Sequence, residues 1–324
     1  MSSVRCSVVI PTYQRLPLLN RCLDALSQQT LSTDAFEVIV VDDGNQLAVA
    51  EAIMAFCRRT GIQTHYLGQR TRRGPAAARN RGWLSARAPI VAFTDDDCLP
   101  QPDWLSAALA QFDQGVTVVT GRLQMPLPDQ PTYHDRTTAF LETAEFITAN
   151  CFCRKSALDQ VGGFEESFAI AWREDSDLQF KLLQAGHVPS PCPEAVVIHP
   201  MRPAPWYAPL RDERKNQYDA LLFKRHPQLF RQRIPAYRGL VVRYYATVLG
   251  GTVGVLGLLL GHTATALAGW GSWLILGGWL VAERWPAEPT QARIRQTVLT
   301  ALATPFLSIY WRLYGAIKYR VAYF

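Results

Sequence analysis

The chain has 324 residues and a formal net charge of +6, with 33 lysines and arginines against 27 aspartates and glutamates. This length is too great for one minimal hydrophobic core and favours one large domain with an appendage. The basic balance favours anionic partners such as nucleic acid, phosphorylated ligands or an anionic membrane. Seven scattered cysteines argue against a disulfide framework or a zinc knuckle and favour free thiols in a reducing compartment. The N-terminus lacks the long apolar core of a signal peptide, so we expect the first half of the chain to be cytosolic.

The first hundred residues alternate between apolar strands and helices. Runs of apolar residues predict strands over residues 6–10, 36–41, 64–67 and 90–93. Helical patterns cover residues 16–28, 47–59 and 74–86. This alternation predicts an α/β fold with a mainly parallel sheet, in which ligands bind beyond the carboxyl ends of the strands.

Residues 90–102, IVAFTDDDCLPQP, place Asp95, Asp96 and Asp97 directly after a buried strand. Three adjacent like charges repel each other, and a divalent cation such as Mg²⁺ or Mn²⁺ is the usual compensation. A solvated acidic turn is the alternative explanation of this stretch. Neither a GxGxxG pattern after the first strand nor a P-loop sequence occurs, so a nucleotide site here would need another device.

A second acidic cluster, a pair of residues, opens a helix further along the chain. The intervening sequence predicts a helix over residues 104–112, a strand over 116–120 and a proline-rich loop over 124–138. Leucines at helical spacing then predict a helix that begins at Glu174 and Asp175 and ends at Gly186. The helix dipole at this N-terminus favours ionised carboxylates by roughly 0.3–1 kcal/mol when they are exposed.

The composition changes after residue 201. Residues 202–243 carry ten arginines and lysines against three acidic residues, and they precede two nearly uncharged stretches, 241–261 and 264–282. Each stretch is about 20 residues long, which suffices to cross a hydrocarbon core. We predict a basic helical juxtamembrane segment over residues 206–240 and a transmembrane hairpin over 241–283. A nucleic-acid-binding patch is one alternative for the basic residues, but this segment lacks an aromatic platform. A buried hairpin of a soluble protein is the alternative for the two apolar stretches.

A third apolar stretch, residues 297–317, is interrupted by Pro305 and Arg312. We expect it to lie in the membrane interface, with a spanning helix as the alternative, within a C-terminal segment 284–324. The polybasic segment would face the cytoplasm. The chain would therefore be held at the inner (cytoplasmic) membrane, with the domain formed by residues 1–205 facing the cytoplasm.

Six motifs occur in the order SVVIPTY, VDDG, GPAAARNRG, FTDDDCLP, VGGFEESF and WREDSDLQFKLLQAG. Together they resemble family-2 glycosyltransferases of the nucleotide-diphosphosugar transferase (GT-A) fold over roughly residues 4–200. The following membrane segments resemble those of bacterial members. The resemblance implies an inverting, metal-dependent transfer of a sugar from a UDP- or GDP-linked donor.

The resemblance also implies roles for the acidic residues. Asp95 matches a residue that faces the ribose or sugar, Asp97 matches the metal ligand, and Asp96 lies between them in the DxD motif. Asp175 matches the general base that takes the acceptor's proton, and Glu174 a neighbour that orients the acceptor. A helix N-cap is the alternative role of Asp175.

The remaining implied contacts surround the nucleotide. They comprise a wall of the base pocket formed by Pro11, Thr12 and Tyr13, a nucleobase or ribose acceptor at Asp42 or Asp43, nucleotide contacts of Arg79 and Asn80, and a metal ligand at His199. The alternative for Arg79 is a purely structural pairing with an aspartate. The alternative for His199 is a structural role.

The sequence thus predicts a membrane-anchored glycosyltransferase whose acceptor is lipid-linked or a surface glycan. A processive polysaccharide synthase is one rival, but the chain lacks a QxxRW-type motif after the acidic pair and has too few membrane segments for a pore. A non-catalytic membrane protein that binds nucleotide sugars is the other. Nucleic acid is not an expected partner, and no motif indicates the oligomeric state.

Overall fold

The structure is a computed structural model that describes residues 4–235 and 238–323. The predicted segments 1–205, 206–240 and 284–324 include residues outside this description, namely 1–3, 236–237 and 324. The chain divides into two compact units. The first contains Met1–Leu127 and Ala139–Met201, and the second contains Pro128–Thr138 and Arg202–Phe324.

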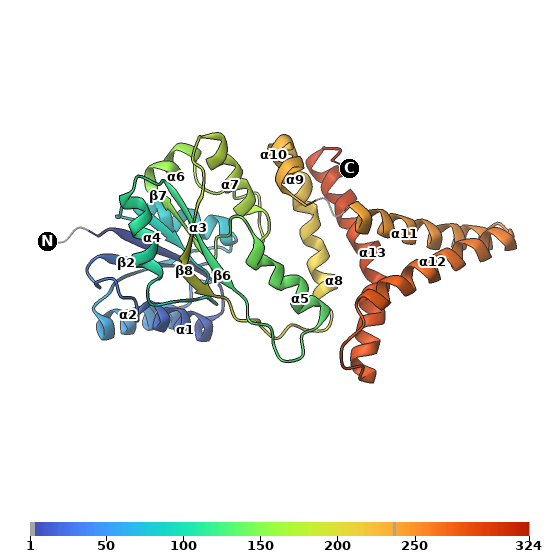
Figure 1. Ribbon diagram of the computed structural model, residues 1–324, viewed down its shortest axis with the longest axis horizontal. Coiled ribbons are helices and arrows are strands. Elements are labelled where there is room, and N and C mark those ends of the chain that lie inside the picture. Colours follow the sequence, from blue (N-terminus) through green and yellow to red (C-terminus); the bar gives the residue numbers. More distant parts are fainter. Residues whose placement is uncertain (1–3, 236–237, 324) are drawn as a thin grey trace. The chain divides into compact units, whose positions relative to one another are not determined.

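The first unit is built on one sheet (Figure 1). Its strand order is β3-β2-β1-β4-β7-β6-β8-β5. The strands are β1 (Cys6–Thr12), β2 (Phe36–Asp42), β3 (Gln63–Gly68), β4 (Ile90–Phe93), β5 (Leu99–Pro100), β6 (Val118–Gln124), β7 (Cys151–Arg154) and β8 (Ser190–Ile198). The strands from β3 to β4 run parallel, β7 is antiparallel to both of its neighbours, and β6 and β8 are parallel. The predicted α/β fold with a mainly parallel sheet is confirmed.

Helices cover both faces of this sheet. They are α1 (Leu16–Leu26), α2 (Leu47–Thr60), α3 (Pro75–Ser85), α4 (Trp104–Asp113), the 3₁₀ helix η1 (Phe140–Thr143), α6 (Lys155–Val161) and α7 (Glu174–Gln184). Val8 and Val38 pack into a core with α1, α2 and α4, whereas Val9 and Ile39 pack into a second core with α3, α6 and α7. The central strands are apolar in continuous runs because both of their faces are buried.

Two elements between residues 116 and 139 differ from the sequence prediction. The strand expected over residues 116–120 begins at Val118 and continues to Gln124, because Arg122 and its successors pair with β8 after an irregularity in the register. The expected loop over 124–138 contains helix α5 (Tyr133–Ala139). Thr132 Oγ1 accepts from the backbone N–H of Asp135, and Asp135 Oδ2 accepts from the backbone N–H of Thr132, which forms a capping box.

Helix α3 lies so close to β1 that only glycine fits at one contact. A Cβ added at Gly82 would lie 2.3 Å from Val9 Cγ1 and 3.3 Å from Val41 Cγ2. We expect Gly82→Ala to lower the free energy of unfolding by about 1–3 kcal/mol, because the helix must move away from the sheet. Chemical denaturation measures this, with Ser85→Ala on the exposed side of the same helix as the control. Equal stability of the two variants would contradict the close packing.

The second unit consists of helices. Besides α5 they are α8 (Ala208–Asp212), the 3₁₀ helix η2 (Glu213–Asn216), α9 (Gln217–Arg225), α10 (Pro227–Arg233), α11 (Arg238–Leu259), α12 (Thr263–Glu283) and α13 (Gln291–Tyr319). In the described part of the chain, α11 and α12 are the two helices long and apolar enough to cross a membrane. Helix α13 starts earlier than the predicted stretch 297–317 and passes through Pro305 without ending.

Helices α11 and α12 form a tight hairpin with closely approaching backbones. A Cβ on Gly257 would lie 2.5 Å from the backbone nitrogen of Ala266, and one on Gly269 would lie 2.3 Å from that of Gly254. Small residues at a helix–helix contact are typical of packing within membranes, where close backbone approach supplies the attraction. Leucines elsewhere on both helices remain exposed, among them Leu256 and Leu267.

Candidate active site

The acidic run after β4 is attached to the end of β1. Thr12 Oγ1 donates to Asp96 Oδ2 at 2.7 Å, and Arg15 Nη1 donates to Asp96 Oδ1 at 3.2 Å. Burial, together with the neighbouring Asp97, raises the pKa of Asp96 to about 6. Both oxygens of Asp96 therefore have donors within the protein, and the carboxylate fixes the position of the run.

The two carboxylates after β2 organise the adjacent loops. Asp42 accepts hydrogen bonds from the backbone N–H groups of Gly44 and Gln46 at 2.8 and 2.6 Å, and from the Tyr66 hydroxyl at 3.1 Å. Thr12 and Asp42 are partners in the register of β1 and β2. Asp42 thus shapes the turn into α2 at the same edge of the sheet as the acidic run.

Asp43 holds the loop that leads into α3. Its oxygens accept from the backbone N–H groups of Arg73 and Gly74 at 2.7 and 2.8 Å, and from Gln69 Nε2 at 3.1 Å. A carboxylate has about four lone-pair sites, so these bonds leave Asp43 little capacity for another donor. The nucleobase or ribose contact expected of Asp42 or Asp43 remains a prediction.

One buried arginine joins two acidic clusters that are distant in sequence. Arg79, which is 2% exposed, donates from Nη2 to Asp95 Oδ1 at 2.7 Å and from Nη1 to Glu174 Oε1 at 3.0 Å. The acidic run after β4 and the pair that opens α7 therefore lie on the same side of the sheet. This pairing is the structural role that the sequence left open for Arg79.

The acidic pair itself lies at a strained helix start, where Glu174 is buried and Asp175 is partly buried. Arg173, directly before it, has φ of +73°, which is uncommon for a residue with a side chain. Burial and then the charge of Asp175 raise the pKa of Glu174 to about 7, and Arg79 opposes this shift. Burial also raises the pKa of Asp175, against the hydrogen bond that its Oδ1 accepts from the Ser176 N–H at 2.6 Å. A carboxylate with a raised pKa is suited to accept a proton.

Asn80 makes its hydrogen bonds to neighbouring protein groups. Its Oδ1 accepts from Trp83 Nε1 at 2.9 Å and from the Phe164 N–H at 2.8 Å. Its Nδ2 donates to the Phe164 carbonyl at 2.9 Å and to Glu166 Oε1 at 3.0 Å. These four bonds use the full capacity of the amide and fasten the loop around Phe164 to α3.

Tyr13 and the loop before α3 form a basic surface next to the acidic clusters. The guanidinium of Arg72 lies 4.3 Å from the centre of the Tyr13 ring, and Pro11 pairs with Val41 in the β1–β2 register. A cavity of about 310 Å³ is lined by Gly68, Gln69, Arg70, Thr71, Arg73 and Arg81. Its arginines offer positive charge for an anionic ligand.

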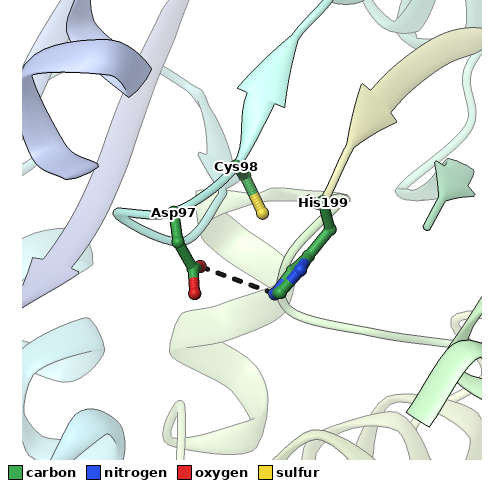
Figure 2. Close-up of side chains that lie close together, drawn as sticks. All are labelled: Asp97, Cys98 and His199. Atoms are coloured by element: carbon green, nitrogen blue, oxygen red, sulfur yellow. Dashed lines mark ion pairs between the residues drawn. The ribbon is translucent and has the colours of Figure 1, made fainter. Parts of the chain in front are cut away.

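Asp97, Cys98 and His199 form a group of potential metal ligands, shown in Figure 2. Asp97 Oδ1 lies 3.5 Å from His199 Nε2, and one donor atom from each of the three residues lies within 4.8 Å of the others. His199 Nδ1 is buried and has no hydrogen-bond partner among the residues that the structure describes. The Asp97 carboxylate and the imidazole Nε2 that faces it are donor types that suit a divalent cation. Cys98 was not among the ligands that the sequence indicated.

The comparison with protein families identifies the family of this chain. Residues 7–171, just over half of the chain, match the family model described as Glycosyl transferase family 2. The chain belongs to this family. The family match ends before Glu174. In this family 2 glycosyltransferase the acidic pair and His199 therefore lie outside the matched residues, and only their positions in the structure relate them to the matched region.

Relatives of known name agree with the family assignment. The glycosyltransferase AglE of Haloferax volcanii is 28% identical over 61% of this chain and 67% of its own length. The pre-mycofactocin glycosyltransferase of Mycobacterium tuberculosis is 30% identical over 60% of this chain but only 43% of its own length.

A solved structure supports the GT-A fold. The mannosyltransferase PcManGT of Pyrobaculum calidifontis, in complex with GDP-Man and Mn²⁺, has a TM-score of 0.55 and 20% identity. The similarity covers 98% of this chain and 87% of that protein. At this identity the likeness concerns the fold, so the substrates of this family 2 glycosyltransferase have to be inferred from its own residues.

Proposed function

We propose that this family 2 glycosyltransferase moves a sugar from a UDP- or GDP-linked donor to a membrane-associated acceptor, with inversion at the anomeric carbon. The observation that carries the proposal is the double ion pair of Arg79, which joins the acidic run after β4 to the acidic pair of α7. A direct displacement requires one acidic group beside the donor and another beside the acceptor.

Asp175 is the proposed general base. The acceptor oxygen forms a bond to the anomeric carbon as the bond from that carbon to the diphosphate oxygen breaks, and the acceptor proton moves to the Asp175 carboxylate. Attack on the face opposite the leaving group inverts the configuration. The bond from Ser176 N–H to Asp175 Oδ1 and the pairing of Glu174 with Arg79 hold the two carboxylates in place.

The nucleotide is proposed to lie along the end of β1, against Pro11, Thr12 and Tyr13. Asp97 and His199 would hold Mg²⁺ or Mn²⁺. Such an ion, when bound, supplies positive charge that stabilises a diphosphate leaving group. Asp95, oriented by Arg79, would contact the ribose or sugar.

Replacement of the proposed ligand Asp97 should weaken cation binding. We expect Asp97→Asn to reduce Mn²⁺ affinity at least about tenfold, because a neutral amide replaces the ionised ligand. Isothermal titration of the metal-free protein with Mn²⁺ measures this, and Asp103→Asn, at an exposed position near the acidic run, is the control. Equal Mn²⁺ affinities for the two variants would exclude Asp97 as a ligand.

The hairpin of α11 and α12 is proposed to anchor the protein in the inner (cytoplasmic) membrane, with the catalytic unit facing the cytoplasm. Exposed leucines on both helices support insertion, and an anchored enzyme suits a lipid-linked or surface-glycan acceptor. The basic residues before α11 favour a cytoplasmic position for that end of the hairpin.

Charges on the lipid-facing surface should prevent anchoring. We expect the double variant Leu249→Asp with Leu274→Asp, at exposed leucines in the middle of α11 and of α12, to lose flotation with vesicles of mixed neutral and anionic lipid. An aspartate in a helix centre costs about 2.5–3.5 kcal/mol. Leu84→Asp, at an exposed leucine of the first unit, is the control and should float like the unaltered chain. Undiminished flotation of the double variant would contradict membrane insertion of the hairpin.

A further inference from the structure

Helix α13 carries an apolar stripe that stays exposed along most of its length. The stripe comprises residues that are each at least 40% exposed, namely Leu299, Phe306, Tyr310, Leu313, Tyr314 and Ile317. Steps of three, four and seven residues place their side chains on one face of the helix. Ala301, Pro305 and Ser308 are buried on the opposite face. Single exposed apolar residues are common on protein surfaces, but a continuous apolar face marks an interaction site.

The middle of α13 packs against the open end of the hairpin of α11 and α12. Ile309 shares an apolar cluster with Tyr244, in the second turn of α11, and with Leu280, in the last turn of α12. The turn that joins the two hairpin helices, residues 260–262, lies at the other end of the hairpin. The contact is therefore made at the end of the hairpin where the chain enters and leaves it.

Both ends of α13 contact segments outside the hairpin. Near its start, Arg293 Nη2 donates to Gln130 Oε1 at 2.7 Å. Near its end, a Cβ on Gly315 would lie 2.5 Å from the Gln217 carbonyl oxygen of α9, and Lys318 Nζ donates to Gln217 Oε1 at 3.1 Å. Helix α13 thus crosses the open end of the hairpin instead of following it to the turn (Figure 1). When the hairpin spans a membrane, a helix that crosses its open end lies at the membrane surface.

The charge around the stripe suits an anionic lipid surface. Residues 289–324 contain no acidic residue and five basic ones, which are Arg293, Arg295, Arg312, Lys318 and Arg320. Four of these flank the stripe at its two ends, where long basic side chains reach headgroup phosphates while their apolar stems lie along lipid. The rings of Tyr310 and Tyr314 suit the same depth. This one-sided charge and these aromatic residues together favour lipid over a second protein as the partner of the stripe.

We infer that α13 lies in the lipid–water interface, with the apolar stripe at the acyl-chain boundary and the basic residues among anionic headgroups. The inference rests on the membrane anchoring in the proposed function and adds a second contact surface to it. The hairpin supplies the anchor, and the stripe sets how the second unit is oriented on the surface. An interfacial helix buries its apolar face by about 5–10 Å, so all parts of the stripe should lie at one shallow depth.

Fluorescence quenching by lipids measures the depth of each position. The variants Leu299→Cys, Phe306→Cys and Leu313→Cys are made singly in the full-length chain. All of them also carry Cys57→Ser, because Cys57 is partly exposed and the other native cysteines are buried. Each is labelled with a nitrobenzoxadiazole dye and reconstituted into vesicles of mixed neutral and anionic lipid. A spin-labelled lipid carries the quencher either near the headgroup or near the end of the acyl chain.

We expect the labels at Leu299, Phe306 and Leu313 to lose more fluorescence to the shallow quencher than to the deep one. A label at Leu274→Cys, in the middle of α12, is the reference for a spanning helix and should lose more to the deep quencher. A label at Leu84→Cys, at an exposed leucine of the first unit, is the reference for water and should respond to neither. The measurement needs no turnover of a nucleotide sugar, so it is independent of the proposed transfer reaction.

Two results would overturn the inference. Deep quenching at Phe306 with shallow quenching at Leu299 is the pattern of a spanning helix. Absence of lipid quenching at all three positions is the pattern of a stripe that faces water or a protein, such as a second copy of the chain. In both cases deep quenching at Leu274 would leave the hairpin anchor standing. Shallow quenching of the stripe without quenching at Leu274 would support the interfacial helix and count against a spanning hairpin.

Discussion

Replacing Asp175 by asparagine is expected to lower the rate of sugar transfer by about 10²–10⁴-fold, while the affinity for the donor nucleotide stays near normal. Asparagine keeps the shape of the side chain and can still accept the Ser176 N–H bond that Asp175 Oδ1 accepts. It cannot accept the acceptor's proton. The loss should therefore fall on turnover and leave donor binding intact.

Initial rates at saturating donor and a separate nucleotide titration measure the two quantities for Asp175→Asn. Asp159→Asn, at an exposed position on α6, is a matched control that should transfer sugar at the normal rate. Loss of donor affinity with intact turnover would contradict the role of Asp175. That result would leave the residue as a donor contact, because the N-cap position of α7 is Arg173 and the helix-cap alternative for Asp175 is wrong.

Removal of the Arg79 guanidinium should have the largest effect on stability. Asp95 Oδ1 and Glu174 Oε1 both pair with this side chain, and its loss leaves the two carboxylates without their shared counter-charge. Breaking a buried ion pair by removing one partner costs about 3–5 kcal/mol. We expect Arg79→Met to lower the free energy of unfolding by about this amount.

Chemical denaturation of Arg79→Met and of Arg81→Met, an exposed arginine on the same helix, measures the difference. A double variant that adds Glu174→Gln should recover part of the loss, because the buried group left behind is then neutral. If Arg79→Met is as stable as Arg81→Met, the ion pairs do not hold the two clusters together.

The fold was predictable from the sequence where local pattern and tertiary burial agree. The run around Val38 and Ile39 is continuously apolar because β2 is buried on both faces, so its pattern identifies it. The second half of β6 has no such pattern, since Gly121 and Arg122 become strand only by pairing with β8. Helix α5 did carry a local signal, the Thr132–Asp135 capping box, inside a proline-rich stretch.

The site was predictable in part. Carboxylates after parallel strands meet at one edge of the sheet, which brings Asp42 and the acidic run together. The sequence could not decide between a nucleotide contact and an ion pair for Arg79, because its partner Glu174 comes from a distant helix. The hydrogen bonds that occupy Asn80 depend on the loop around Phe164, and the position of Cys98 opposite His199 depends on the β5–β8 register. Neither leaves a periodic trace in the sequence.

Incubation of the purified protein with a panel of UDP- and GDP-sugars, with and without Mn²⁺, tests the central claim most directly. Release of free nucleoside diphosphate is the quantity to measure. One nucleotide sugar is expected to be consumed, with dependence on Mn²⁺ and on Asp175. A protein that binds nucleotide sugars but releases no nucleoside diphosphate under any condition would contradict a catalytic role for the acidic clusters joined by Arg79.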